Sequence, residues 1–471
     1  MRHRFLLVPA LAFAVPLACQ STAVSPSGGS TRSRPPESSQ AQAPPAAPSD
    51  AVGQKFEAWV AAINSGDRAR IDAVWSGAKD AELRAATDVA TAERSGGFEL
   101  HRVEDATATE MLAVVRARRT ERWLCLFFNV DPEPPHAIED IVLRPTAAPP
   151  AGDKTGAAPP LDDKTRAQIV QALVRELNRA YVFPEKAASM DRELLARQRQ
   201  HVYDSIASRL TFARALTDDL QRVTHDKHLH VNVDCSRGAS RPGREHHGPV
   251  PGATDRPRVF GASKRLDGNI AYVDIATFGI PADQVKDEIR ETMSAAADAA
   301  AIIFDVRRNG GGEPETVALV SSYLFGAEPV HLNSLYWRIP DRTDDFFTDP
   351  RVQGAKFGPT KPVYVLTSGH TFSAAEEFTY NLQTRKRAVI VGETTGGGAH
   401  PGDVAQLPHG FTVFVPSGRA INPITNTNWE GTGVKPDVEV AAEKALDTAH
   451  QLAREKVGKG SNSDGAAPSK K

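Results

Sequence analysis

The sequence contains few cysteine, methionine and aromatic residues. Its 471 residues include 3 cysteines and 4 methionines, and aromatic side chains make up 7%. With so few thiols, a disulfide between Cys125 and Cys235 is possible but is not the first expectation, and paired Cys-x-x-Cys zinc motifs are absent. The chain also lacks an excess of charge of either sign, because 56 lysines and arginines nearly balance 58 aspartates and glutamates. This balance provides no field that would attract nucleic acid, so we expect no nucleic-acid partner.

After residue 18, the sequence has no apolar run long enough to span a bilayer. The run from Phe5 to Leu17 follows the basic Arg2-His3-Arg4 and is itself too short for a stable transmembrane helix, so we predict residues 1–18 to be an export signal. Cleavage before Cys19 would leave a thiol to be lipidated, whereas Ser21-Thr22-Ala23 offers an ordinary cleavage site. We favour a lipoprotein that is periplasmic or anchored to the cell envelope, with a secreted protein as the alternative. We expect the protein to contact a membrane only through the lipid on Cys19.

Length and apolar content predict several domains. The chain exceeds the length that one core usually organises, and 40% of its residues are apolar. The segment at 19–51 is rich in serine, proline and alanine and is predicted to be a disordered tether, and 149–160 is a shorter linker. The remaining boundaries that we predict are 52–148 for an N-terminal domain, 161–235 for a helical subdomain, 236–258 for a loop, 259–446 for a core, and 447–471 for a helix end and mobile tail.

Periodicity predicts a fold class for each of these regions. Residues 52–148 begin with helical spacing, as in Phe56 and Trp59, and continue with alternating runs, which predicts an α+β domain. Helical spacing recurs through 161–235 and predicts a small helical bundle. Residues 259–446 alternate β-branched runs with helical segments, which is typical of an α/β core.

The segment Thr367 to Phe378 places a serine at a strand-to-helix turn. A β-rich run, Pro362 to Leu366, breaks through small residues into a helix that opens beside Ser373. The free N–H groups and the positive end of that helix could stabilise an oxyanion, so Ser373 is a candidate nucleophile. Two alternatives remain: Ser373 only caps the helix, or Ser368 in the same turn is the nucleophile.

Three other segments carry groups that an acyl-transfer site requires. These groups are His228 within 224–231, the run Gly310 to Gly312 after an apolar strand, and Glu430 within 428–437. An imidazole can take the proton of a serine hydroxyl, and a carboxylate can orient the imidazole and stabilise its cationic form. Glycine lets backbone N–H groups approach a substrate carbonyl where a Cβ would obstruct.

Each of these groups also has a purely structural interpretation. His225 and His230 lie close to His228 and suggest a metal site, but no His-Glu-x-x-His or paired Cys-x-x-Cys motif accompanies them, so we favour a catalytic base. Glu430 could be a solvated loop residue, and the glycines could form an ordinary tight turn. Three polar residues before the glycines are expected to hold that turn by local hydrogen bonds, namely Asp305, Arg307 and Asn309.

Together, the four segments resemble the tricorn-core and C-terminal-processing serine peptidase family, in its branch similar to interphotoreceptor retinoid-binding protein. The resemblance covers roughly residues 160–446 and implies an α/β spiral core of the crotonase/ClpP-like type. It implies that Ser373 is the nucleophile, His228 the general base and Glu430 the acid that orients the base. The backbone N–H groups that it implies for the oxyanion hole are those of Gly311 and Ala374.

The chain departs from the family pattern in several places. Lys227 stands where the family has glycine in Asp-Gly-His-Leu. Another branch uses a lysine after the nucleophile as its base, but Gly392 to Gly398 contains no lysine, so a Ser/Lys dyad is disfavoured. The loop at 236–258 is too short for the peptide-binding PDZ module of C-terminal-processing relatives. Near the N-terminus, Phe56-x-x-Trp59 and Asn64-Ser65-Gly66-Asp67 resemble the nuclear-transport-factor-like family, which implies an α+β cone.

The main resemblance implies a serine-type peptidase that cleaves peptides or unfolded proteins through an acyl-enzyme, with no cofactor and no metal. One alternative is a non-catalytic protein that binds retinoid-like or lipid-like ligands on the same fold, and another is an esterase-type acyl hydrolase. The sequence leaves the natural substrate and the oligomeric state open.

Overall fold

A computed structural model describes residues 47–78, 81–150, 159–235 and 258–463. By their contacts, these described residues belong to one unit. The predicted export signal, Cys19, nearly all of the tether and almost the whole 236–258 loop lie outside the described residues. Within the described ranges, none of the helices is long and apolar enough to cross a membrane.

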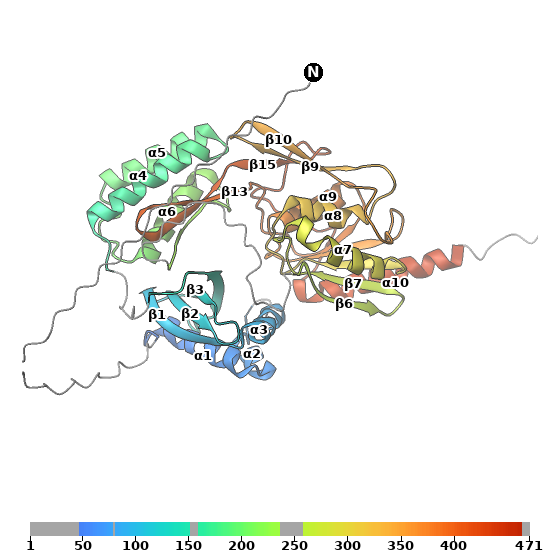
Figure 1. Ribbon diagram of the computed structural model, residues 1–471, viewed down its shortest axis with the longest axis horizontal. Helices are drawn as coiled ribbons and strands as arrows, with labels where there is room; N and C mark the ends of the chain where they lie inside the picture. Colours follow the sequence, from blue (N-terminus) through green and yellow to red (C-terminus); the bar gives the residue numbers. More distant parts are fainter. Residues whose placement is uncertain (1–46, 79–80, 151–158, 236–257, 464–471) are drawn as a thin grey trace, which may run out of the picture. The chain divides into compact units, whose positions relative to one another are not determined.

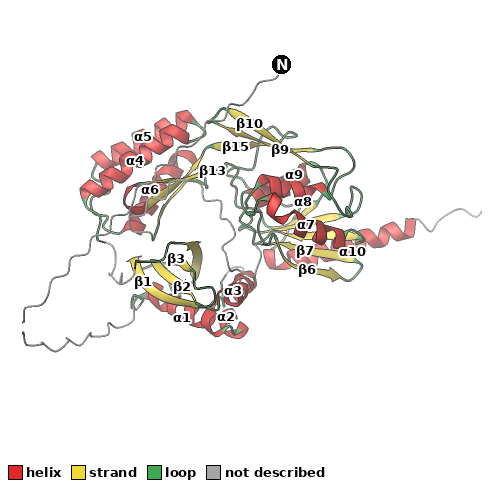
Figure 2. Cartoon of the chain, viewed as in Figure 1, coloured by secondary structure: helices red, strands yellow, loops and turns green. Residues whose placement is uncertain are grey.

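Helices precede an antiparallel sheet in the N-terminal part, as the sequence pattern predicts (Figure 2). The elements are α1 (Ala51–Ser65), α2 (Arg68–Val74), α3 (Ala81–Ser95), β1 (Phe98–Ala106), β2 (Glu110–Ala117), β3 (Trp123–Val130) and β4 (Ile138–Pro145). The strands lie in the order β1-β2-β3-β4. Asp50 caps α1 by accepting the N–H of Gly53 at 3.2 Å, and Trp59 of α1 stacks on Phe98 of β1 with ring centroids 5.7 Å apart. One face of the sheet is thereby covered by the helices.

The other face of this sheet packs against a second set of helices. These are α4 (Asp163–Ala180), α5 (Pro184–Arg199) and α6 (Arg209–Thr224). Leu112 and Val114 of β2 belong to the same buried cluster as Leu173 and Leu216 of these helices. The carboxylate of Asp105 accepts hydrogen bonds from the Ser208 hydroxyl at 2.8 Å and from the N–H of Leu210, in the first turn of α6, at 2.9 Å.

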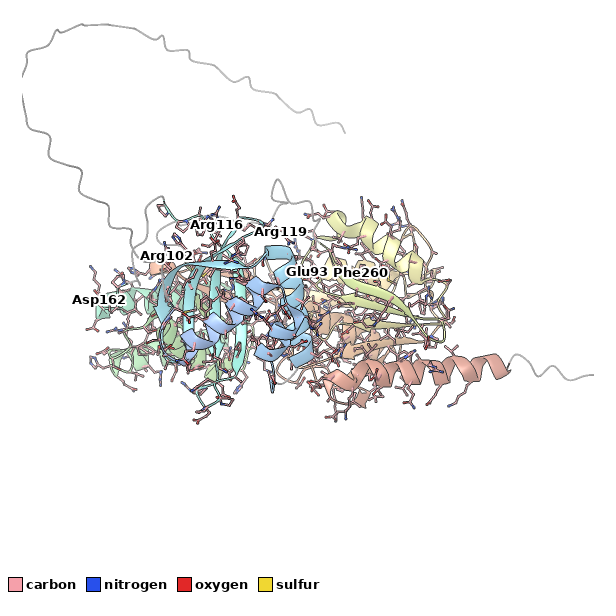
Figure 3. The ribbon with its side chains drawn as sticks, turned by 90° about the horizontal axis from the view of Figure 1, so that it is seen from below. Glu93, Arg102, Arg116, Arg119, Asp162 and Phe260 are labelled. Carbon is pink, nitrogen blue, oxygen red and sulfur yellow. A yellow bond between two sulfur atoms is a disulfide. The ribbon has the colours of Figure 1, made fainter. Side chains whose placement is uncertain are left out.

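A disulfide joins Cys125 of β3 to Cys235, a pairing that the sequence allowed but that was not the first expectation. The two residues are 110 apart in sequence, and sequence reasoning placed them in different domains. They meet because the second face of the sheet is also buried. Arg102 of β1 is labelled in Figure 3, and its Nη2 donates to the Cys235 carbonyl at 3.4 Å.

We expect the double variant Cys125→Ser/Cys235→Ser to lose about 4–5 kcal/mol of unfolding free energy, because a closed loop of this length restricts the unfolded chain. Such a loss corresponds to a Tm lower by roughly 5 °C in differential scanning calorimetry. Reductant should lower the Tm of the wild type to that of the variant and leave the variant unchanged. Equal Tm values for the oxidised wild type and the variant would contradict the expectation.

The strand that follows α6 pairs with strands from a distant part of the chain. β5 (His230–Val233) pairs antiparallel with β14 (Phe411–Pro416), which pairs in turn with β13 (Gly402–Gln406). A short 3-10 turn, η1 (Pro408–Gly410), connects β13 and β14. The region predicted as a helical bundle therefore contains a small sheet whose other two strands come from residues 402–416.

A six-stranded sheet with the order β16-β12-β11-β8-β7-β6 organises the remaining core. Its strands are β6 (Phe260–Leu266), β7 (Ile270–Ile275), β8 (Ala301–Asp305), β11 (Val363–Thr367), β12 (Val389–Gly392) and β16 (Val438–Glu439). The helices of this region are α7 (Ala282–Ala296), α8 (Pro314–Ser322), α9 (Ala374–Thr384), η2 (Ala442–Lys444) and α10 (Ala445–Ser463). A separate sheet contains β10 (Arg342–Phe347), β9 (His331–Trp337) and β15 (Gly418–Ile421).

Helices cover both faces of the six-stranded sheet (Figure 1). α7, α8 and α9 share one buried cluster with Val273, Phe304 and Val365. The alternate residues Tyr272, Ile303 and Leu366 point to the opposite face and pack against α10. β8 and β11 are parallel neighbours, so the turns that leave their carboxyl ends lie side by side.

Candidate active site

Ser373 lies between β11 and α9 in a strained backbone conformation. Its φ of 54° and ψ of −121° lie in a region that residues with a Cβ rarely adopt. The N–H of Ser373 donates to Glu376 Oε2 at 2.9 Å. Ala374 begins α9, and no carbonyl of the helix itself can accept its N–H. Ser373 is therefore the cap of α9 and is also held where the helix N-terminus could stabilise an adjacent negative charge.

Ser368 has a structural role in the same turn. It is fully buried, and its hydroxyl donates to the Arg307 carbonyl at 2.6 Å. This bond ties the serine turn to the turn after β8. A substrate could not reach Ser368 in this arrangement, so the geometry favours Ser373 as the candidate nucleophile.

The glycine turn after β8 lies directly against Ser373. The N–H of Gly311 donates to Asn309 Oδ1 at 2.9 Å, and Asn309 Nδ2 donates to the Ile275 carbonyl at 3.0 Å, which confirms the predicted role of Asn309 in holding the turn. Gly311 has a φ of 112°, and a Cβ on it would lie 2.7 Å from Ser373 Cβ and 3.0 Å from the Ala374 nitrogen. Glycine is thus required at this contact.

Arg307 and Asp305 also brace the glycine turn, as predicted. They form a buried ion pair at 2.6 Å, and Arg307 Nη1 donates to the Ala442 carbonyl at 2.6 Å.

His228 lies in the short connection between α6 and β5. Its N–H donates to Asp226 Oδ1 at 3.1 Å. The imidazole packs on the ring of Phe372, the residue before Ser373, with centroids 4.5 Å apart. A Cβ on Gly398 would lie 2.5 Å from His228 Cε1, so the Gly396–Gly398 loop approaches the imidazole closely. The structure thus places His228 next to the serine turn although the two are 145 residues apart in sequence (373 − 228).

Glu430 lies close to His228, although it comes from the C-terminal part of the chain. Its Oε2 accepts the Ala399 N–H at 2.6 Å. Donor atoms of Asp226, His228 and Glu430 lie within 4.8 Å of one another. His228 Nδ1 and Glu430 Oε1 are both buried and form no hydrogen bond among the described residues. The three side chains could hold a cation, and two of them are the pair that a serine–histidine–acid triad would use.

Glu376 links the serine turn to the glycine loop beside His228. This fully buried carboxylate accepts the N–H groups of Ser373 at 2.9 Å, Gly397 at 2.6 Å and Gly398 at 2.8 Å. It also accepts the Thr395 hydroxyl at 2.5 Å. One side chain therefore fixes the relative positions of the nucleophile's backbone and the loop that packs on the imidazole.

Sequence reasoning missed Asp226, His400 and Tyr181. Asp226 Oδ2 accepts from the Tyr181 hydroxyl at 3.1 Å and lies 2.8 Å from His400 Nδ1. His400 Nδ1 is also 3.5 Å from Glu430 Oε2, so this imidazole lies between the two carboxylates. The available signals were the aspartate of the Asp-x-His motif and a histidine two residues after the glycine run. Lys227, the departure from the family pattern, donates from Nζ to the Gly396 carbonyl at 2.5 Å.

Burial controls the ionisation of the candidate base and acid. Burial lowers the pKa of His228 to about 4, although the nearby Asp226 opposes the shift. Burial raises the pKa of Glu430, and the charge of Asp226 raises it further, while His400 and backbone N–H groups lower it. The imidazole of the free protein is therefore neutral near pH 7 and able to accept a proton.

We expect the rate of modification of Ser373 by a fluorophosphonate to stay above half its plateau value at pH 5.5. The reaction needs neutral His228, which is lost only as the pH falls through its lowered pKa of about 4. An ordinary imidazole with a pKa near 6.5 would be only about 10% neutral at pH 5.5. Rates measured from pH 4 to 8, with circular dichroism to show that the fold persists, test this. A half-maximal rate at pH 6.5 or above would contradict it.

Residues 269–440 match Peptidase family S41, and residues 163–262 match the N-terminal domain of Peptidase_S41 in eukaryotic IRBP. The chain belongs to peptidase family S41. The two matched regions contain all the site residues described above.

Similar proteins include C-terminal-processing enzymes. The chain is 31% identical over 131 residues to "Tail-specific protease" of Haemophilus influenzae, a match that covers 27% of this chain and 17% of that protein. It is 29% identical over 170 residues to "Carboxyl-terminal-processing peptidase 2, chloroplastic" of Arabidopsis thaliana, covering 36% of this chain and 31% of that protein. The chain thus spans less than a third of the length of either relative. Among solved structures, the photosystem II D1 C-terminal processing protease is similar to this chain, with 18% sequence identity and a TM-score of 0.40. The match covers 62% of this chain and 97% of that one.

Proposed function

We propose that this protein is a serine-type peptidase that hydrolyses peptide bonds through an acyl-enzyme. The observation that supports it most is the convergence of a strained serine at a helix N-terminus, a glycine turn in contact with it, and a buried histidine and glutamate beside it. The names of the two curated relatives support carboxyl-terminal segments as substrates.

In the proposed reaction, Ser373 Oγ attacks the scissile carbonyl while His228 takes its proton. Glu430 orients the imidazole and stabilises the imidazolium that forms. His228 then donates the proton to the leaving amine, and water reverses the sequence to release the acyl group. The hydrogen bonds between these side chains form when the substrate closes the site, since catalytic contacts are often long in the free enzyme.

The proposed oxyanion hole combines the start of α9 with the glycine turn. Ala374 N–H is the main donor, since it belongs to the unpaired first turn of the helix. Gly311 N–H already donates to Asn309 Oδ1, so it would be shared with the oxyanion. Gly311 contributes above all by the absence of a Cβ where the carbonyl must fit.

We also propose a fold type for two of the domains. The core is proposed to be of the crotonase/ClpP-like spiral type, and the N-terminal domain to be a nuclear-transport-factor-like cone. Export through residues 1–18 and lipidation at Cys19 are proposed as well, and they would place the enzyme in the cell envelope.

Hydrolysis of an unfolded protein tests the proposed function. β-Casein incubated with the wild type should yield fragments whose ends mass spectrometry can assign, and the Ser373→Ala variant should yield none. A folded wild type that leaves β-casein intact and instead binds retinol would favour the ligand-binding alternative.

A further inference from the structure

The outer edge of β4 pairs with no strand among the described residues. The Thr146 N–H donates to the Trp123 carbonyl at 3.0 Å, and Val142 lies opposite Phe127 in the same antiparallel register. Hydrogen-bonded pairs recur every second residue on each strand. The backbone groups of even-numbered residues 140–144 therefore face β3, and those of Ile141 and Leu143 face the free edge.

Two neighbouring features agree with this assignment of the residues whose backbone groups face the free edge. The Glu139 carbonyl faces the same edge, and it accepts a hydrogen bond from Arg84 Nη1 at 2.8 Å. Pro145, which has no N–H to offer, occupies the next outward position. The unpaired edge is therefore a short stretch, Ile141 to Leu143, between Arg84 and Pro145.

A cavity of about 350 Å³ adjoins one face of β4. Its apolar lining includes Leu112 and Phe127 of the N-terminal sheet and Leu210 and Val233 of the helical region. His230 also lines it, with Nδ1 2.5 Å from the carbonyl oxygen of His228. The candidate base thus lies two residues from the wall of this cavity.

A second cavity, of about 290 Å³, adjoins β4 on the side of the serine turn. Ile141 of β4 lines it together with Arg308 of the glycine turn and His370 of the serine turn. His370 precedes Ser373 by three residues, so the wall begins within roughly 11 Å of the nucleophile along the chain. Asp140 of β4 lines both cavities, whereas Val142 lines only the first and Ile141 only the second, so the two cavities lie on opposite faces of β4.

We propose that the free edge of β4 binds the substrate as an added strand. This proposal rests on the proposed function and names the substrate as an extended, unfolded segment of polypeptide. Backbone groups of the segment would pair with Ile141 and Leu143, and alternate side chains would point toward the 350 Å³ cavity. Its lining combines apolar side chains with the charged Glu110, Arg144 and Arg214, so it suits a large side chain that has both an apolar and a polar part. Most backbone groups of a folded protein are already paired within its own helices and sheets, so an unfolded segment has many more of them to offer this edge. Here the N-terminal domain selects unfolded chains and directs them past His228 and Ser373.

The Leu143→Pro variant removes an outward N–H and keeps the bonds between β4 and β3. Pro145 shows that the strand accepts proline at a position whose backbone faces the free edge. The matched control is Leu100→Pro on β1, at the opposite edge of the sheet. The Arg118 N–H donates to the Gly97 carbonyl, so the backbone groups of Leu100, three residues later, face away from β2. Both leucines pack against the same core. We expect Leu143→Pro to raise the KM for β-casein by about 10-fold and the control to leave it within about 2-fold. Fluorophosphonate labelling of Ser373 in both variants shows that the serine turn is intact.

Amide hydrogen exchange gives a second readout that needs no catalysis. β-Casein added to the Ser373→Ala protein should slow exchange at Ile141 and Leu143 and leave Leu100 unchanged. An unchanged KM in labelled Leu143→Pro, or the absence of protection on β4 with saturating β-casein, overturns the proposal. A wild type that neither labels nor cleaves overturns the proposed function instead, whatever the exchange experiment shows.

Discussion

The His228→Ala variant is expected to hydrolyse peptides with kcat/KM lowered by about 10³-fold or more. The imidazole packs on Phe372, directly before Ser373, and its pKa of about 4 leaves it neutral at pH 7 and able to accept the proton of the serine. Steady-state hydrolysis of a fluorogenic peptide measures the loss. Because a small probe needs the same activation, labelling of Ser373 should fall in parallel.

His225 provides the matched control for this variant. It is exposed at the end of α6 with a φ of 58°, a conformation that asparagine tolerates. His225→Asn should therefore retain kcat/KM within about 2-fold. Retention of most activity in His228→Ala, or an equal loss in His225→Asn, would remove His228 from the role of general base.

The Gly311→Ala variant is expected to lose at least about 10²-fold in kcat. Its Cβ would lie 2.7 Å from Ser373 Cβ and 3.0 Å from the Ala374 nitrogen, so the serine turn or the glycine turn must move. Either movement displaces the donors from the position of the oxyanion. The φ of 112° adds backbone strain for any residue other than glycine.

Gly310→Ala is the control, because a Cβ at Gly310 meets nothing within 4 Å and its φ lies outside the left-handed region. We expect that variant to keep kcat within about 3-fold. Thermal melts of both variants separate a loss of catalysis from a loss of folding. Equal activity of the two variants would mean that contact between the glycine turn and Ser373 has no part in the reaction.

Local patterns predicted the elements of the site but not all of their connections. The apolar run before Gly310, the strand-to-helix turn at Ser373 and the strand after His228 all follow from periodicity and turn chemistry. Periodicity cannot name a strand's partner, however, and the pairing of β5 with β14 joins residues about 180 apart. The meeting of His228 and Glu430 was predicted only through the family resemblance.

The packing of the N-terminal sheet was missed for a different reason. We predicted its strands from alternating runs, but residues 110–115 of β2 are all buried, with Met111 and Leu112 on opposite faces. A continuous apolar stretch of this kind indicates that both faces are covered. That signal could have suggested the disulfide, since Cys125 lies on the second face. The links through Asp226, His400 and Glu376 depend on buried polar side chains whose partners lie far away in sequence, and no local rule identifies them.

The central claim is that Ser373 is activated by His228 and Glu430. The most direct test is to treat the purified protein, without residues 1–18, with a fluorophosphonate and to locate the adduct by mass spectrometry. The account predicts an adduct on Ser373 in the wild type, none in Ser373→Ala, and less than about 1% of the wild-type rate in His228→Ala. A folded wild type that remains unlabelled, or that is labelled at another serine, would contradict it.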